Sequence, residues 1–183
     1  MSCNIKHLFI VLTSLFCNFS FCNELEDLDY VSALDKPTFS INSPDRQITL
    51  TGESSSSLDG SEFIIQIPNF KLNSNIFSVN INSEDAIFNK DVGYIKFKDS
   101  VKLQSLSKKD NLLISSEEIA LDFTNKTFSS TEEVLTNLND LEIKSLGMEL
   151  TQKGDNLYAE FSKGSFQIKN AGTINKGYAE KLY

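Results

Sequence analysis

The stretch Ile95-Lys96-Phe97-Lys98-Asp99-Ser100-Val101-Lys102-Leu103 decides the fold of this chain. In a β-strand its aliphatic and aromatic side chains would point one way, and its lysines and Ser100 would point the other way. Such alternation is typical of an antiparallel strand with one buried face and one solvated face. Turn-forming residues stand on both sides, with Gly93-Tyr94 before the stretch and residues 107–111 after it.

A four-residue pattern recurs along the chain: an aliphatic residue, a polar residue, a small residue and usually an acid. It occupies residues 50–53, 81–84, 114–117 and 143–146, at spacings of 31, 33 and 29 residues. A near-constant period indicates one supersecondary unit that is used several times. Alternating residues fill the intervals, so we interpret each occurrence as the start of a strand. The chain is therefore predicted to be all-β, with a long stacked sheet and a continuous apolar interior.

The same alternation predicts which side chains face the interior. This inward set comprises Ile48, Leu50, Phe63, Ile65, Phe77, Val79, Ile81, Ile95, Phe97, Val101, Leu103, Ile114, Leu121, Phe123, Ile143, Met148, Phe161, Phe166 and Ile168. The apolar runs predict about a dozen or more short strands. Residues 132–141 could form a turn of helix, but the repeat favours strand, turn and strand there.

The two ends of the chain differ from its middle. Lys6 precedes an uncharged stretch from His7 to Cys22, which fits either a cleaved secretory leader or a retained membrane anchor over residues 1–22. Residues 23–36 are acidic and are interpreted as a linker. The β-domain is expected over residues 37–170, and residues 171–183 are expected to fray as a tail.

Composition argues against several classes of function. All three cysteines and the single histidine lie within residues 1–22, so the exported part has no thiol or imidazole chemistry and no disulfide framework. Because Lys6 is the only Lys or Arg in the leader and no acid lies there, the remainder holds 16 basic and 25 acidic residues, a net charge of −9. That balance argues against nucleic acid as a partner, since nucleic acid requires a basic surface.

Catalytic and metal-binding patterns are weak. The adjacent acids at 84–85, 117–118 and 132–133 would point to opposite faces of a strand, so they would not share a site. A Ser-His-Asp arrangement has no base in the exported part. No short acidic loop with a turn glycine suits calcium, and no cofactor is indicated. The chain is therefore not expected to be an enzyme. The remaining candidate is the interior, which is either an ordinary closed sandwich core or a surface that holds lipid.

The order of several short motifs resembles the LptC family of lipopolysaccharide export proteins. A Pro-x-Phe start is matched at 37–40 and an aliphatic-x-aliphatic-x-small strand at 48–52. A Gly-Tyr hairpin follows at 93–103, with Ser100 where the family favours Asn. A Gly-Met ending stands at 146–149, before the strand 157–161. The resemblance covers about residues 37–169 and implies a twisted, partly open antiparallel β-jellyroll.

The resemblance also implies a function and partners. The chain would shield lipopolysaccharide acyl chains in its interior, with the inward set other than Ile48, Phe166 and Ile168 contacting the lipid. It would lie in the periplasm, with a possible anchor in the inner membrane. It would pass lipid from an inner-membrane ABC transporter to a periplasmic bridge protein, meeting both by strand addition. The N-terminal strands around 39–50 would meet the transporter, and the strands around 157–168 the bridge. An LptA-like soluble bridge protein and an exported structural or adhesive β-sandwich remain the alternatives.

Overall fold

The computed structural model describes residues 33–182, apart from residues 43, 45, 58–59, 75–76, 108–110, 154–155 and 171–172. The predicted leader at 1–22 and most of the predicted linker lie outside the described residues. None of the described residues forms a helix that is long and apolar enough to cross a membrane.

The described part of the chain is one antiparallel sheet of fourteen strands. In chain order the strands are β1 Ala33–Asp35, β2 Thr38–Asn42, β3 Arg46–Thr51, β4 Ser54–Ser57, β5 Glu62–Gln66, β6 Asn69–Ser74, β7 Phe77–Asn82, β8 Asp85–Asn89, β9 Tyr94–Ser107, β10 Asn111–Asp122, β11 Thr127–Leu138, β12 Leu141–Lys153, β13 Asn156–Asn170 and β14 Thr173–Leu182. The fold class predicted from the sequence is confirmed, and residues 132–141 form strand, turn and strand.

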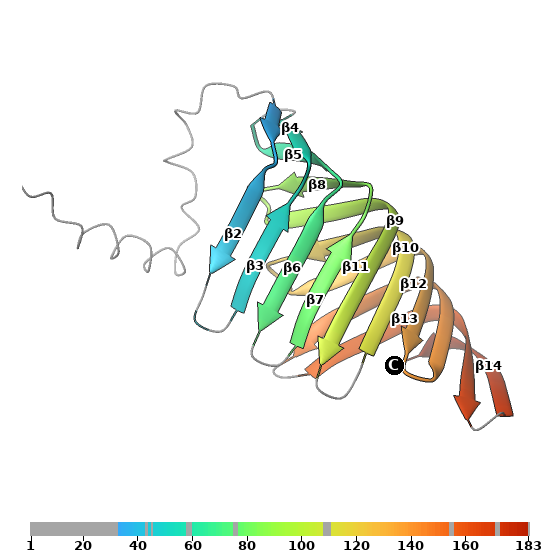
Figure 1. The fold of residues 1–183 in the computed structure, drawn as a ribbon. Helices are drawn as coiled ribbons and strands as arrows, with labels where there is room; N and C mark the ends of the chain where they lie inside the picture. The colour runs from blue at the N-terminus through green and yellow to red at the C-terminus, as the bar shows by residue number, and fades with distance from the viewer. Residues whose placement is uncertain are drawn as a thin grey trace, which may run out of the picture. The chain divides into compact units, whose positions relative to one another are not determined.

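The sheet is folded over on itself along a corner. Strands β1, β4, β5 and β8 make one half, and β2, β3, β6 and β7 make the other. We call these half-sheet A and half-sheet B. The long strand β9 joins them, because Tyr94–Lys98 pairs with β8 and Lys102–Ser107 pairs with β7. From β9 onward the long strands bend across the corner and run through both halves. Figure 1 shows β2, β3, β6 and β7 side by side, with the long strands continuing their layer and folding over.

The two half-sheets face each other through one apolar core. Aromatic rings make the contact across this core. Phe70 belongs to β6 of half-sheet B, and Phe97 belongs to the part of β9 that lies in half-sheet A. Their ring centroids are 5.7 Å apart. Large side chains from both halves, such as Ile65, Ile81 and Leu103, are fully buried between them. The fold is thus a sandwich whose two layers are halves of one continuous sheet.

The recurring sequence pattern marks the corner. The structure corrects the prediction that it marks strand starts. Its last two residues are Gly52-Glu53 between β3 and β4, Ser83-Glu84 between β7 and β8, Ser116-Glu117 in β10 and Ser145-Leu146 in β12. At each of these points the chain passes from half-sheet B to half-sheet A. The aliphatic residue of the pattern is the last core residue before the corner, and the fourth residue is exposed outside it.

A second series marks the return passages from half-sheet A to half-sheet B. Here non-glycine residues take a positive φ: Lys36 at 50°, Ile67 at 49°, Asp99 at 60° and Lys163 at 48°. A residue in the left-handed backbone conformation turns the strand sharply. Non-glycine residues rarely adopt this conformation, because it brings their Cβ too close to the backbone. Asp99 is also the one residue that breaks the alternation of residues 95–103. Asp99 lies at the corner, which explains why a polar residue stands at this position of the alternating pattern.

Hydrogen bonds continue through the corner in two ways. In the N-terminal part, backbone groups form these hydrogen bonds: Lys36 N donates to Glu53 O at 3.0 Å, and Ile67 N donates to Glu84 O at 2.7 Å. Serine hydroxyls add bonds: Ser83 Oγ donates to Asp85 O at 2.8 Å, and Ser145 Oγ to Gly147 O at 3.1 Å. The small third residue of the repeat therefore has a structural role.

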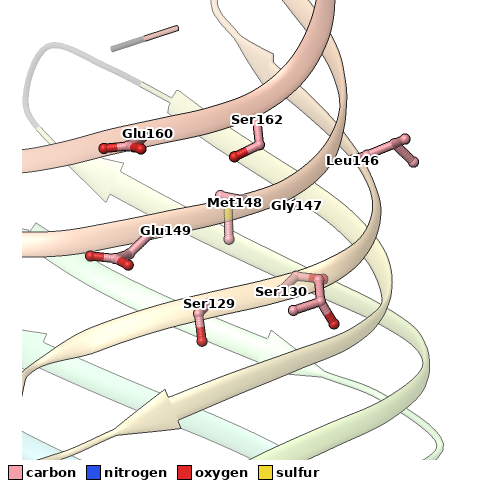
Figure 2. A pocket seen from close by; sticks show the side chains of 9 residues that line it. Ser129, Ser130, Leu146, Gly147, Met148, Glu149, Glu160 and Ser162 are labelled. Carbon is pink, nitrogen blue, oxygen red and sulfur yellow. The ribbon is translucent and has the colours of Figure 1, made fainter. Parts of the chain in front are cut away.

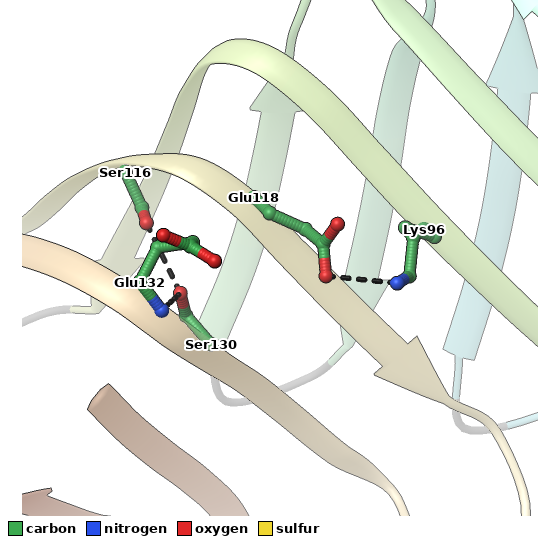
Figure 3. Close-up of polar contacts among 5 residues, drawn as sticks. All are labelled: Lys96, Ser116, Glu118, Ser130 and Glu132. Carbon is green, nitrogen blue, oxygen red and sulfur yellow. Dashed lines mark hydrogen bonds and ion pairs between the residues drawn. The ribbon is translucent and has the colours of Figure 1, made fainter. Parts of the chain in front are cut away.

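Strands β10 and β11 contain a bulge, because their register shifts between Ser116 and Ala120. The backbone groups at this bulge are bonded by side chains. Ser116 Oγ donates to Glu133 O at 3.0 Å, and Ser130 Oγ accepts from Glu132 N at 3.2 Å. The oxygen atoms of the two hydroxyls lie 3.0 Å apart. Figure 3 draws this contact as a dashed line between Ser116 and Ser130. Buried side-chain hydroxyls thus satisfy backbone groups that the ladder leaves unpaired.

Three further expectations need correction. β1 lies at 33–35, inside the stretch interpreted as a linker, because its backbone pairs with β4 and extends half-sheet A. β14 lies inside the predicted tail and pairs with β13 along nearly its whole length. The strands from β9 onward have 10 to 15 residues rather than being short, because each continues through the corner without a break.

The first corner provides a test of this account. A Cβ on Gly52 would stand 2.3 Å from Ile65 Cγ2 and 2.9 Å from Gln66 O, so Gly52→Ala must displace the buried Ile65 side chain and the backbone of β5. We expect a fall in melting temperature of several degrees, since about 1 kcal/mol shifts it by about 4 °C in a domain of this size. Ser83→Ala, at the same place in the next repeat, already has room for a Cβ and loses one hydrogen bond. Melting temperatures are measured by circular dichroism. An equal fall in the melting temperature of both variants would contradict the steric role of Gly52.

Candidate functional site

The inward face of the sheet holds the residues that the sequence singled out. Thirteen of the sixteen predicted lipid contacts are buried in the core: Leu50, Ile65, Val79, Ile81, Ile95, Phe97, Val101, Leu103, Ile114, Leu121, Ile143, Met148 and Phe161. Phe63 and Phe123 are partly buried and pack against them. Phe77 is in β7, but its side chain is outside the described set. The structure therefore gathers the described members on one continuous surface.

The predicted inward set omitted seven residues that the structure buries in the core: Phe70, Leu72, Ala86, Ile119, Phe128, Val134 and Leu150. Phe70 and Leu72 follow Pro68, and a proline normally interrupts a ladder. Pro68 instead sits between β5 and β6, at the corner. The alternation Phe70-Lys71-Leu72 was the signal that could have found this strand.

The interior is tightly packed in its middle and reaches solvent at both ends. At the N-terminal end the inward rows finish on Leu34 in β1 and Ile41 in β2, which are 39% and 38% exposed. In the middle, residues such as Phe97 and Leu103 are fully buried. At the C-terminal end the rows through Ile143 and Leu141 continue to Phe166 and Ile168 on β13, which are only half-buried.

The last strand contributes little bulk to the interior around Gly177, although Leu182 at its end packs against the core. Gly177 of β14 pairs with Phe166, and a Cβ at Gly177 would lie 2.5 Å from Phe166 Cζ. The ring therefore occupies the place where a β14 side chain would stand. The next inward position on β14 is Ala179. Small residues here leave the apolar rows of β12 and β13 partly uncovered at this edge.

Three phenylalanines bridge the half-sheets at the N-terminal end. Phe39 comes from β2 of half-sheet B, and Phe63 and Phe88 come from β5 and β8 of half-sheet A. The Phe39 ring centroid lies 5.8 Å from that of Phe63 and 5.3 Å from that of Phe88. We call this group the aromatic clasp. It joins an edge strand of five residues to the opposite layer.

The titratable groups with shifted pKa values lie away from the interior. Lys96 Nζ lies 2.9 Å from Glu118 Oε1 on the outer face, and this hydrogen bond raises the pKa of Lys96. Figure 3 shows the pair. At the β10–β11 turn, backbone N–H groups of Asn125 and Thr124 donate to Asp122 and lower the pKa of its carboxyl. Both are structural contacts of the outer surface.

A hollow of about 360 Å³ lies at the corner of β11, β12 and β13. There β12 and β13 are unpaired between Lys144 and Met148, and Gly147 has a φ of +95°. Figure 2 shows Glu149 and Glu160 pointing the same way beside it. Its lining is mainly serine, glutamate and backbone, and Met148 is the one predicted site residue in it. Within the described ranges, no three His, Cys, Asp or Glu side chains gather as metal ligands.

The comparison with known families decides the broad identity of the chain. Residues 61–158, more than half of its length, match the family described as lipopolysaccharide-assembly, LptC-related. The chain belongs to this LptC-related family. The matched segment runs from β5 into β13 and includes most of the shared core. Membership links the chain to lipopolysaccharide transport. No curated protein sequence matches it significantly.

The aromatic clasp should stabilise the N-terminal end of this LptC-related fold. Phe39→Ala removes two ring contacts, each worth about 0.5–1.5 kcal/mol. We expect a lower melting temperature and faster hydrogen exchange in β2 than in β7. Tyr178→Ala is the control, since Tyr178 is 63% exposed on β14. Equal effects of the two changes would refute the clasp as a stabilising contact.

Proposed function

We propose that this chain is the periplasmic component of lipopolysaccharide export that shields acyl chains between its two half-sheets. It takes lipid from an inner-membrane ABC transporter and passes it to a periplasmic bridge protein. One observation carries the proposal: the inward rows, which are apolar apart from buried Ser and Thr side chains, extend from β1 and β2 to β13, and they are exposed or half-buried at both ends. Family membership supplies the lipid class.

The energetics of the interior favour acyl chains as its ligand. Each methylene that leaves water contributes about 0.8 kcal/mol, so chains of a dozen carbons are strongly driven into an apolar surface. The buried polar side chains among the described residues are all Ser or Thr, so the chains would meet no buried charge.

Lipid would have to separate the half-sheets, because the middle of the interior is already filled. Such separation breaks side-chain contacts such as Phe70 with Phe97, but not the strand ladders. The acyl chains then cover the apolar surface that the separation exposes. The net cost of opening is therefore reduced by the ligand itself. We expect the ends to open first, where the inward residues are least covered.

Partners would add strands at the free edges of the sheet, and only the edge strand β2 overlaps the stretches 39–50 and 157–168 that were expected from sequence. Strand β13 is paired on both sides, with β12 and β14, so its backbone is not available. Strand β3 is likewise enclosed by β2 and β6. Among the described strands, β1, β2 and β14 each pair on one side only. We assign the transporter to β1 and β2, and the bridge protein to β14.

A charge at an open end tests the lipid surface with little effect on folding. Ile41→Glu places a carboxylate at the N-terminal end of the interior, where Ile41 is already partly exposed. The neighbouring Ser40 points to the opposite face of β2. We expect Ile41→Glu to lower lipopolysaccharide capture by the purified chain at least several-fold, because the lipid must desolvate the charge.

Ser40→Glu is the matched control and should leave capture unchanged. Thermal melts of both variants separate binding from folding. Equal capture by both variants would contradict the interior as the lipid surface. If the folded wild-type protein captured no lipopolysaccharide, the closed structural sandwich would be the better reading.

Photocrosslinkers test the edges. A photoreactive residue at Ser40 of β2 should capture the transporter, and one at Tyr178 of β14 should capture the bridge protein. Lys71 and Lys102 are exposed on the enclosed strands β6 and β9 and serve as controls. Bridge-protein adducts from Ser40, with transporter adducts from Tyr178, would reverse the polarity that we propose. Adducts from the controls alone would exclude strand addition.

A further inference from the structure

Two hydroxyls in the interior have no hydrogen-bond partner. Ser55 Oγ and Thr136 Oγ1 are the buried side-chain polar atoms of the described chain that remain unpaired. Their residues are only 3% and 1% exposed. An unpaired buried hydroxyl destabilises a fold, because it gives up its bonds to water and gains none in return. Val at 136 or Ala at 55 would avoid this loss.

The contrast with other buried serines makes these two positions unusual. Ser116, Ser130 and Ser145 are also buried, but each hydroxyl bonds to the backbone or to another hydroxyl at the corner. Those serines have a structural role. Ser55 and Thr136 make no such hydrogen bond at the corner.

Both hydroxyls belong to the inward rows. Ser55 on β4 stands in register between Leu34 and Ile65, one strand from the edge at β1. Thr136 on β11 stands in register between Ile114 and Ile143, in the part of half-sheet B that leads to β14. Each is a polar atom surrounded in its row by aliphatic side chains. One lies near the N-terminal end and the other toward the C-terminal end.

We propose that Ser55 and Thr136 bind an oxygen-bearing group on the acyl part of the lipid, such as a hydroxyl, an ester or an amide. This inference rests on the proposed function, since it needs acyl chains in the interior. A plain hydrocarbon chain has no hydrogen-bond donor or acceptor for these hydroxyls. A chain with an oxygen along its length supplies the missing hydrogen bond and removes the destabilisation. The two positions therefore select functionalised chains over plain ones.

Binding of simple fatty acids to the full chain tests this selection. Isothermal titration calorimetry compares tetradecanoic acid with its 3-hydroxy and 12-hydroxy derivatives, which place the oxygen near either end of the chain. We expect at least one hydroxylated acid to bind about fivefold more tightly, which corresponds to about 1 kcal/mol for one hydrogen bond. The double variant Ser55→Ala, Thr136→Val should lose this preference while still binding tetradecanoic acid.

Two controls separate recognition from folding. Thr136→Ser keeps a hydroxyl and should retain the preference when Ser55 is intact. Thr136→Val should melt at the same temperature as the wild type or higher, because it removes only an unpaired hydroxyl. A clear fall in its melting temperature would show that the hydroxyl has a structural partner, and would overturn the inference.

Equal affinity of the wild type for all three acids would also overturn it, as would a preference that survives in the double variant. In these cases the proposed function stands, because the acids still bind. If the wild type bound none of the three acids, the lipid-binding interior would itself be refuted, and the inference with it.

Discussion

The contact between the two half-sheets is the constraint on which the rest of the structure depends. One continuous sheet can face itself only if every strand turns at the same line, and the corner supplies that turn. Left-handed residues such as Lys36 and Lys163 make the return passages, and small residues make the outward ones. The corner fixes the distance between the layers. Side chains such as Phe70 and Phe97 can then meet across the interior.

This arrangement concentrates the apolar surface of the domain inside a two-layered structure whose ends are less covered than its middle. The strand ladders hold each layer together, while side-chain contacts alone hold the layers to each other away from the corner. Apolar contacts are non-directional, so acyl chains can take the place of side chains without a loss of hydrogen bonds. A lipid carrier needs this property, because it must bind its cargo and release it without unfolding.

The sequence predicted the interior well because alternation reports directly on which face of a strand is dry. Ile95 and Phe97 are buried, while Lys96 and Lys98 are partly exposed on the other face, as predicted. The corner was not predicted, since a turn inside a continuous strand leaves the alternation almost intact on both sides. Asp99 disturbs the pattern in β9, and the buried positions shift by one residue at the corner in β10, between Ile114 and Ile119, and in β12, between Ile143 and Met148. Strand β14 was missed because Gly172, Gly177 and mixed charge are typical of a tail, whereas pairing with β13 depends on backbone groups that composition does not show. The unpaired hydroxyl of Thr136 is a matter of three-dimensional surroundings, and no spacing in the sequence identifies it.

The most direct test of the account uses two neighbouring residues of one strand. Phe63 and Ile64 of β5 are both partly buried, but Phe63 faces the interior in the aromatic clasp and Ile64 lies on the outer face. A photoreactive amino acid at each position, irradiated in the presence of lipopolysaccharide, compares the two faces at similar exposure. The account predicts lipid adducts from position 63 and few or none from position 64. Equal adducts from both positions, or adducts from position 64 alone, would contradict the claim that acyl chains lie between the half-sheets.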